Sequence, residues 1–115
     1  MSVAIYHNPR CSKSREALKL LEEKGVEPQI IKYLDMPPDH ATLSRILEQL
    51  GLEPRELMRK KEKEYKDNGL DNPDLTRDQL IDAMVAHPKL IERPIVINGE
   101  KAALGRPPEQ VLNIL

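Results

Sequence analysis

The dipeptide Asn98-Gly99 constrains the fold most, because it separates two short apolar runs near the end of the chain. Asn-Gly in such a position is the strongest short-range signal for a β-hairpin, since both residues tolerate the positive φ of a tight turn. We therefore predict antiparallel strands over residues 94–97 and 101–104. A last helix is expected from residue 106 to residue 115, opened by two prolines.

The N-terminal segment predicts a second pairing of strands. Val3–Tyr6 reads as a short strand that is apolar enough to be buried on both faces. A helix is expected to begin near Cys11 or Ser12 and to end near Gly25, and residues 29–33 predict another strand. A β-α-β unit of this kind joins parallel strands by a right-handed crossover.

The stretch between these two parts is helical in pattern. Asp39 is a predicted N-cap, Pro54 suits the first turn of another helix, and Thr76 with Gln79 forms a predicted capping box. The charged run over residues 59–67 predicts a break and a solvated turn. The whole order indicates one α/β domain over residues 1–115. It predicts a thioredoxin-like fold with a mixed four-stranded sheet and a helical insertion over about residues 39–88.

Composition excludes several classes of function. The net charge is −1, and the chain has no Phe or Trp and three Tyr, which argues against nucleic-acid binding. No apolar stretch approaches the roughly 20 residues of a membrane span, and no secretory leader is visible. The single cysteine excludes an internal disulfide, so we expect a cytoplasmic location. One Cys and three His at unrelated spacings predict no metal site.

The segment His7-Asn8-Pro9-Arg10-Cys11-Ser12-Lys13-Ser14-Arg15 carries the chemistry. A thiol where a helix begins meets free N–H groups and a partial positive charge, which stabilise the thiolate. The same N–H groups favour a bound anion. The competing interpretations are a buried apolar Cys11, a plain loop His7 and a Ser14 that bonds only to backbone.

Cys11 has no second thiol with which to resolve a mixed disulfide, because the pattern is Cys-x-x-Ser. An outside thiol, from glutathione or a partner redoxin, is therefore expected. Arg93 and Arg106 lie at predicted strand ends, and a guanidinium binds tetrahedral oxyanions through paired N–H groups. Taken alone, an arginine such as each of these, or Arg59, is more often a solvated surface charge.

The signature His7-Asn8-Pro9-x-Cys11-x-x-Ser14-Arg15 resembles that of the glutaredoxin-dependent arsenate reductases, the ArsC family. The likeness is strongest to its short bacterial members of the YfgD type. It extends over essentially the whole chain, in order through residues 27–28, 33–38, 55–60, 80–82, 87–96 and 106–107. The Ser12-Lys13 pair departs from the smaller residues of the best-studied reductases.

The resemblance implies a thioredoxin-like fold with a helical insertion and a cytoplasmic arsenate reductase. It implies that no cofactor is bound, that glutathione is the co-substrate, and that glutaredoxin is the protein partner of an expected monomer. It also implies a cis bond between Arg93 and Pro94. The implied site comprises the nucleophile, two residues that lower its pKa, three oxyanion-binding arginines and one structural proline: Cys11, His7, Ser14, Arg59, Arg93, Arg106 and Pro94.

Two other functions stay open from the sequence. A monothiol oxidoreductase acting on glutathionylated proteins would use Cys11 without an oxyanion clamp. The Spx-type regulators, which bind RNA polymerase, share the fold and the site region. They commonly carry Cys-x-x-Cys as a redox switch, which this chain lacks.

Overall fold

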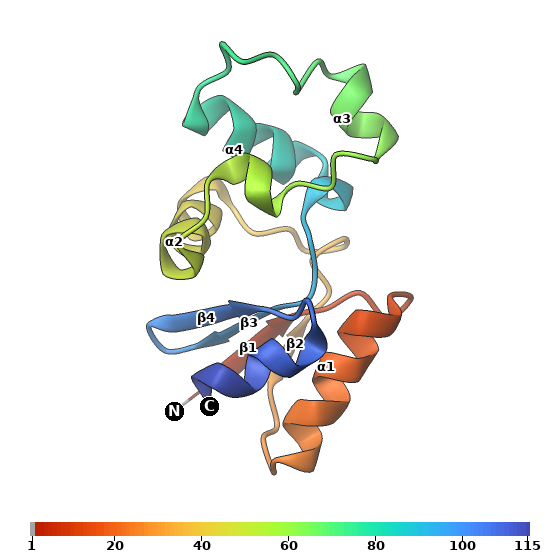
Figure 1. The fold of residues 1–115 in the computed structure, drawn as a ribbon, viewed down its shortest axis with the longest axis vertical. Helices are drawn as coiled ribbons and strands as arrows, with labels where there is room; N and C mark the ends of the chain where they lie inside the picture. Colours follow the sequence, from red (N-terminus) through yellow and green to blue (C-terminus); the bar gives the residue numbers. More distant parts are fainter. Residues whose placement is uncertain (1) are drawn as a thin grey trace. The chain divides into compact units, whose positions relative to one another are not determined.

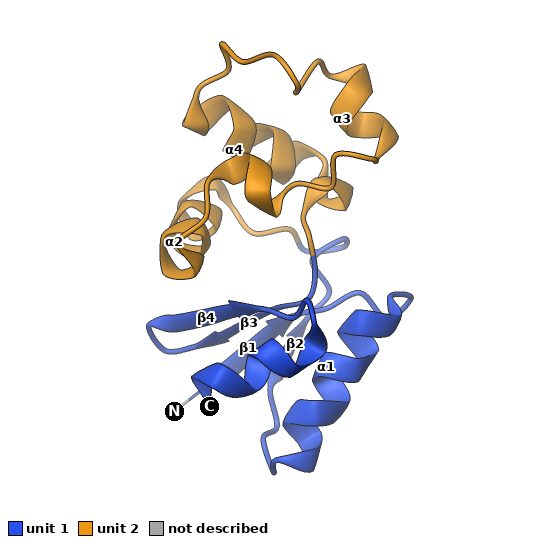
Figure 2. Cartoon of the chain, viewed as in Figure 1, with its two compact units in different colours: residues 1–36, 93–115 blue, residues 37–92 orange. Residues whose placement is uncertain are grey.

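The computed structural model describes residues 2–115, and the chain divides into two compact units. One unit holds the residues up to Met36 together with Arg93–Leu115, and the other holds Pro37–Glu92 (Figure 2). The sequence-based assignment of a single domain with an insertion over about residues 39–88 stays a prediction.

The first unit is built on a four-stranded sheet with the order β2-β1-β3-β4 (Figure 1). Its strands are β1 (Val3–Tyr6), β2 (Gln29–Ile31), β3 (Ile95–Asn98) and β4 (Lys101–Leu104). β1 pairs with β2 in parallel and with β3 antiparallel, and β3 pairs antiparallel with β4. The predicted mixed sheet, and with it the thioredoxin-like α/β class, is confirmed.

Helix α1 (Ser12–Glu23) and the 3₁₀ helix η3 (Pro108–Ile114) pack on one face of this sheet (Figure 1). The sequence predicted a last helix in this region, and the structure gives it 3₁₀ geometry. Burying each large aliphatic side chain here stabilises the unit by about 1.5–3 kcal/mol. The buried core of the unit draws on all of these elements except β2: Ile5, Ala17, Leu21, Val96, Ala103, Val111 and Ile114.

Strand β1 is less buried than the sequence suggested. Ile5 is fully buried against the core, whereas Val3, Ala4 and Tyr6 are half-buried. Because side chains alternate between the faces of a strand, Ala4 and Tyr6 lie on the face opposite Ile5. The expectation of a strand buried on both faces is therefore wrong for this short element.

The hairpin turn lies one residue later than predicted. Asn98 pairs with Lys101, so the two turn residues are Gly99 and Glu100. Gly99 has a φ of 62°, and none of the non-glycine residues described has a positive φ. A glycine in the first turn position with an ordinary second residue is typical of a type II′ turn. Asn98 instead ends β3, and its side-chain N–H donates to the carbonyl of Ile114 at 2.6 Å.

The second unit is helical and contains α2 (His40–Leu50), η1 (Pro54–Leu57), α3 (Lys63–Asp67), α4 (Arg77–Ala86) and η2 (Pro88–Leu90). The predicted caps are confirmed. Asp39 Oδ1 accepts the Thr42 N–H at 2.8 Å, and Thr76 and Gln79 form a reciprocal capping box.

Helix α3 was not expected, since residues 59–67 read as a break and a solvated turn. The structure places a short helix at Lys63–Asp67 within this charged run. Tyr65 is the reason, because its side chain is buried and fixes the helix to the unit. Within residues 2–115, none of the helices is long and apolar enough to cross a membrane.

Candidate active site

The loop from β1 to α1 places Cys11 at the start of the helix. Pro9 disfavours helical geometry at Asn8, so the helix cannot extend back to that residue. The Asn8 carbonyl accepts the Cys11 N–H at 3.0 Å, and Asn8 Oδ1 accepts the Arg10 N–H at 3.0 Å. Cys11 is the N-cap residue, and its carbonyl accepts the Arg15 N–H at 3.0 Å, the first bond of the helical ladder.

The thiol of Cys11 has a pKa below its ordinary value. Burial raises the pKa, but this effect is outweighed by the backbone N–H of Ser14, the Arg93 guanidinium and the backbone N–H of Lys13. All three favour the charged form of the sulfur. The half-buried thiol is therefore accessible and biased toward the thiolate, which is the nucleophilic form.

His7 and Ser14, which are both buried, contact one another. His7 Nδ1 and Ser14 Oγ lie 2.6 Å apart, and Ser14 Oγ accepts the Asn8 N–H at 3.1 Å. Burial, followed by the charges of Lys32 and Arg15, lowers the pKa of His7. The imidazole is therefore neutral near neutral pH. These bonds tie the Cys11 loop to α1, so His7 and Ser14 are placed to hold the thiol's position.

Arg93 is brought to Cys11 from the far end of the sequence. Its guanidinium interacts with Cys11 by hydrogen bonding and by charge. Arg93 Nε is buried and has no hydrogen-bond partner among residues 2–115. Arg106 joins this pair, because its Nε donates to the Arg93 carbonyl at 3.1 Å. The Arg93–Pro94 bond is cis, as the resemblance implied, and so is the Arg106–Pro107 bond, which was not predicted.

Gly105 is a site residue that the sequence did not single out. Its N–H donates to the Pro94 carbonyl at 2.8 Å. A Cβ added at Gly105 would lie 2.6 Å from Pro94 Cγ and 3.3 Å from Val111 Cγ1. A residue without a side chain is thus required where the chain leaves β4 and passes Pro94. The only sequence signal is a glycine next to Arg106, which by itself is uninformative.

Arg59 lies in the second unit, where it is held by two carboxylates. Its Nη1 is 2.6 Å from Glu62 Oε1, and its Nε is 3.1 Å from Glu92 Oε1. The Arg59 N–H also donates to the Leu90 carbonyl at 2.7 Å. The structure thus fixes the local surroundings of Arg59, and its oxyanion-binding role stays a prediction.

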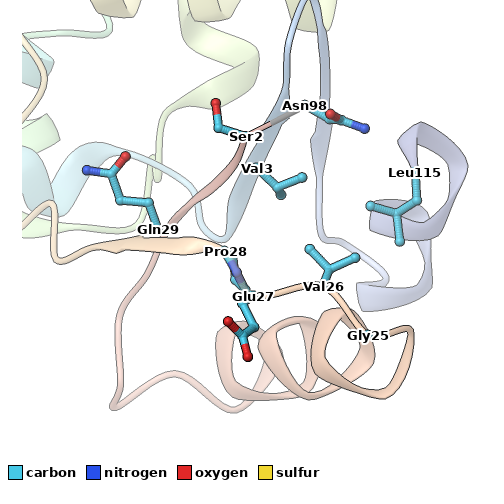
Figure 3. A pocket seen from close by; sticks show the side chains of 9 residues that line it. All are labelled: Ser2, Val3, Gly25, Val26, Glu27, Pro28, Gln29, Asn98 and Leu115. Carbon is cyan, nitrogen blue, oxygen red and sulfur yellow. The ribbon is translucent and has the colours of Figure 1, made fainter.

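A pocket of about 720 Å³ lies away from Cys11, at the start of β1 (Figure 3). Ser2 and Val3, the segment from Gly25 to Gln29, Asn98 and Leu115 line it. Among residues 2–115, Glu27 is the only ionisable side chain of the lining, and none of these lining side chains is cationic. The described residues, 2–115, contain no group of three His, Cys, Asp or Glu that could hold a metal ion.

The arrangement around Cys11 combines three chemical features within the first unit. It has a thiol with a lowered pKa, helix N–H groups beside it, and a guanidinium with a buried, unpartnered N–H. A nucleophilic thiolate normally repels an anion, and fixed N–H donors and a positive charge offset that repulsion. The site is therefore suited to nucleophilic attack on an oxyanion.

The chain resembles known proteins over nearly its whole length. The model of the ArsC family matches residues 6–114. An arsenate reductase structure from Vibrio cholerae is 58% identical, with a TM-score of 0.97 over 100% of this chain and 98% of that one. The arsenate reductase of Neisseria meningitidis serogroup A is 53% identical over 98% of this chain and 97% of its own. The Escherichia coli K12 protein YfgD is 58% identical over 98% of this chain and 96% of its own.

Proposed function

Because the chain belongs to the ArsC family, we propose that it is an arsenate reductase with the Cys11 thiolate as its nucleophile. The observation that carries this proposal is the pairing of Cys11 with Arg93. The guanidinium lowers the thiol pKa, and its buried Nε has no partner within residues 2–115. A thiolate and an oxyanion donor thus lie side by side.

In the proposed first step, the Cys11 thiolate attacks the arsenic of arsenate. A sulfur–arsenic bond forms, one arsenic–oxygen bond breaks, and the oxygen leaves as water after protonation. Arg93 and Arg106 hold the remaining oxygens, a role that the resemblance to the family also implies for Arg59. The N–H groups at the start of α1 share the negative charge. His7 and Ser14 act by positioning the loop that carries Cys11.

The electrons come from outside thiols, because Cys11 is the only cysteine of the chain. The glutathione thiol displaces a second oxygen of the bound arsenic, which leaves as water. A glutaredoxin thiolate then attacks the glutathione sulfur, a disulfide forms between them, and the electron pair of the broken sulfur–arsenic bond reduces As(V) to As(III). Hydrolysis of the remaining bond releases arsenite and the Cys11 thiol. This sequence requires no bound cofactor and suits a monomer in the reducing cytoplasm.

The test is a coupled assay of NADPH oxidation with arsenate, glutathione, glutaredoxin and glutathione reductase. The native chain should show oxidation that depends on each component, and Cys11→Ser should abolish it. Arsenate-dependent turnover by Cys11→Ser would refute the proposal.

The same assay separates the two other functions considered from the sequence. Activity on a glutathionylated protein that is indifferent both to arsenate and to Arg93→Ala would indicate a monothiol oxidoreductase. Co-purification with RNA polymerase, without any arsenate-dependent turnover, would indicate an Spx-like regulator.

A further inference from the structure

A second pocket, of about 320 Å³, adjoins the Cys11 loop within the first unit. It is lined by His7, Asn8, Pro9 and Arg10, and by Lys32, Leu34 and Asp35 from the segment after β2. Since β1 and β2 are parallel neighbours, both segments follow the carboxyl ends of their strands. Open α/β sheets bind their ligands at this edge.

One peptide bond and one hydrogen bond connect the lining of the pocket to Cys11. Arg10 precedes Cys11 in the chain, and the Cys11 N–H donates to the carbonyl of Asn8, another lining residue. The pocket therefore borders the loop that carries the nucleophile. The volume is at the lower end of the range for small-molecule sites, about 300–1,000 Å³.

The pocket is lined by two cations and one anion. Arg10, Lys32 and Asp35 are exposed, and none of them has an ion-pair partner within 4.0 Å among the residues described. Lys32 and His7 line the same pocket, and the charge of Lys32 contributes to the lowered pKa of His7. Pro9 and the exposed Leu34 add apolar surface between the charges.

We propose that this pocket binds the outside thiol that Cys11 requires, a zwitterionic tripeptide of the glutathione type. The inference rests on the proposed function, which needs such a co-substrate. A γ-glutamyl-cysteinyl-glycine molecule carries two carboxylates and one ammonium, and the pocket offers two cations and one carboxylate. Arsenate gains nothing from Asp35, whose negative charge repels it, so this pocket suits the co-substrate rather than the oxyanion.

The bound tripeptide has one chemical step to perform. Its thiol sulfur attacks the arsenic held on Cys11, a second sulfur–arsenic bond forms, and one oxygen leaves as water with the thiol proton. No electrons are transferred in this step. Arg10 and Lys32 hold the carboxylates of the tripeptide and Asp35 holds its ammonium, so that the thiol faces Cys11.

Binding can be measured without the reaction by titrating the native chain with S-methylglutathione, which has no free thiol, and following amide resonances by NMR. Saturable shifts are expected at Asn8, Arg10 and Leu34. Lys32→Ala should weaken binding about three- to fivefold, as expected for a solvent-exposed ion pair. Lys19→Ala is the matched control, since Lys19 is exposed on α1 and outside the pocket, and it should not change binding.

A paired comparison tests the orientation of the ligand. Asp35→Asn should weaken binding of S-methylglutathione by a similar factor. It should leave unchanged the binding of the analogue that lacks the α-amino group. Equal effects on both ligands would contradict the assigned contact between Asp35 and the ammonium.

The outcomes separate this inference from the proposed function. Arsenate-dependent turnover with a glutathione KM that Lys32→Ala leaves unchanged would refute the pocket and leave the reductase intact. Saturable binding at the pocket without arsenate turnover would support the pocket and refute the reductase. Failure of the native chain to bind S-methylglutathione saturably would overturn the inference.

Discussion

At the scale of single residues, the reactivity of Cys11 comes from three neighbours that act against burial. Two are backbone N–H groups, which no substitution of their own side chains removes, and the third is Arg93. The sequence predicted the helix-start effect directly. It offered no means to bring Arg93 to Cys11, because that contact joins opposite ends of the chain, and the resemblance to the ArsC family supplied the pairing.

Replacing Arg93 by Gln should raise the pKa of Cys11, since the substitution removes a positive charge that favours the thiolate. The pH dependence of Cys11 alkylation by iodoacetamide measures this, and its midpoint should move to higher pH. Arg45→Gln is the control, because Arg45 is exposed on α2 and does not contribute to the Cys11 pKa. An unshifted midpoint in Arg93→Gln would show that Arg93 does not act on the thiol.

Replacing Ser14 by Ala should lower the free energy of unfolding by about 1–3 kcal/mol, because one buried and one partly buried polar group lose their partner. These are the Asn8 N–H and His7 Nδ1, and Ser14 itself is fully buried. Urea unfolding of Ser14→Ala measures the effect, with Ser12→Ala, an exposed position of the same helix, as the control. Equal stabilities of the two variants would contradict the role given to Ser14.

At the scale of elements, local signals predicted most of the architecture. The caps at Asp39 and Thr76 were confirmed because capping depends on residues within one turn. The predicted hairpin is present, but its turn lies one residue later, since Asn98 belongs to β3 and its side chain is bonded to the Ile114 carbonyl. Helix α3 was missed because the burial of Tyr65 is a tertiary effect that a charged sequence hides.

Replacing Gly105 by Ala should lower the free energy of unfolding by about 1–3 kcal/mol, as overpacking usually does. The new Cβ would meet Pro94 Cγ at 2.6 Å, and the proline ring has little freedom to move. Chemical denaturation checks this, together with Glu100→Ala in the exposed hairpin turn, which should change stability by less than about 0.5 kcal/mol. Alkylation of Cys11 in Gly105→Ala should also change, because Pro94 is bonded to Arg93.

Within the second unit, His40 connects α2 to α4 and should make stability depend on pH. His40 Nδ1 lies 2.6 Å from Asp82 Oδ1 and Nε2 lies 3.2 Å from Asp78 Oδ1. The hydrogen bond to Asp82, followed by the Asp82 charge and by Asp78, raises the pKa of His40 above 6.5 against a smaller opposing effect of burial. The stabilisation is therefore fully present below about pH 6.5 and is lost as the pH rises through the raised pKa.

Urea midpoints of the native chain and of His40→Gln, measured from about pH 5 to about pH 8, isolate this effect. The comparison is needed because His7 contributes a pH dependence of opposite sign. Its lowered pKa makes the folded state lose stability as the pH falls. At low pH the urea midpoint of the native chain should exceed that of His40→Gln, and the difference between the two midpoints should shrink as the pH rises. A difference that does not vary with pH would contradict the assignment.

At the scale of the whole molecule, the net charge does not reveal the positive charge around Cys11. The chain carries a net charge of −1, yet residues 7–15 hold three cationic side chains and no acid. Folding adds Lys32 beside His7 and Arg93 beside Cys11. Composition therefore argues against a nucleic-acid partner but does not indicate an oxyanion. Only the sequence around Cys11 and the contacts made by folding indicate that chemistry.

The central claim is that Cys11 forms a covalent bond to arsenic, and peptide mass spectrometry tests it most directly. The chain is incubated with arsenate and glutathione in the absence of glutaredoxin, so that the reaction stops before reduction. We predict an arsenic- and glutathione-containing adduct on the peptide that holds Cys11, which disappears when glutaredoxin is added. An adduct retained by Cys11→Ser, or catalytic turnover by that variant, would contradict the account.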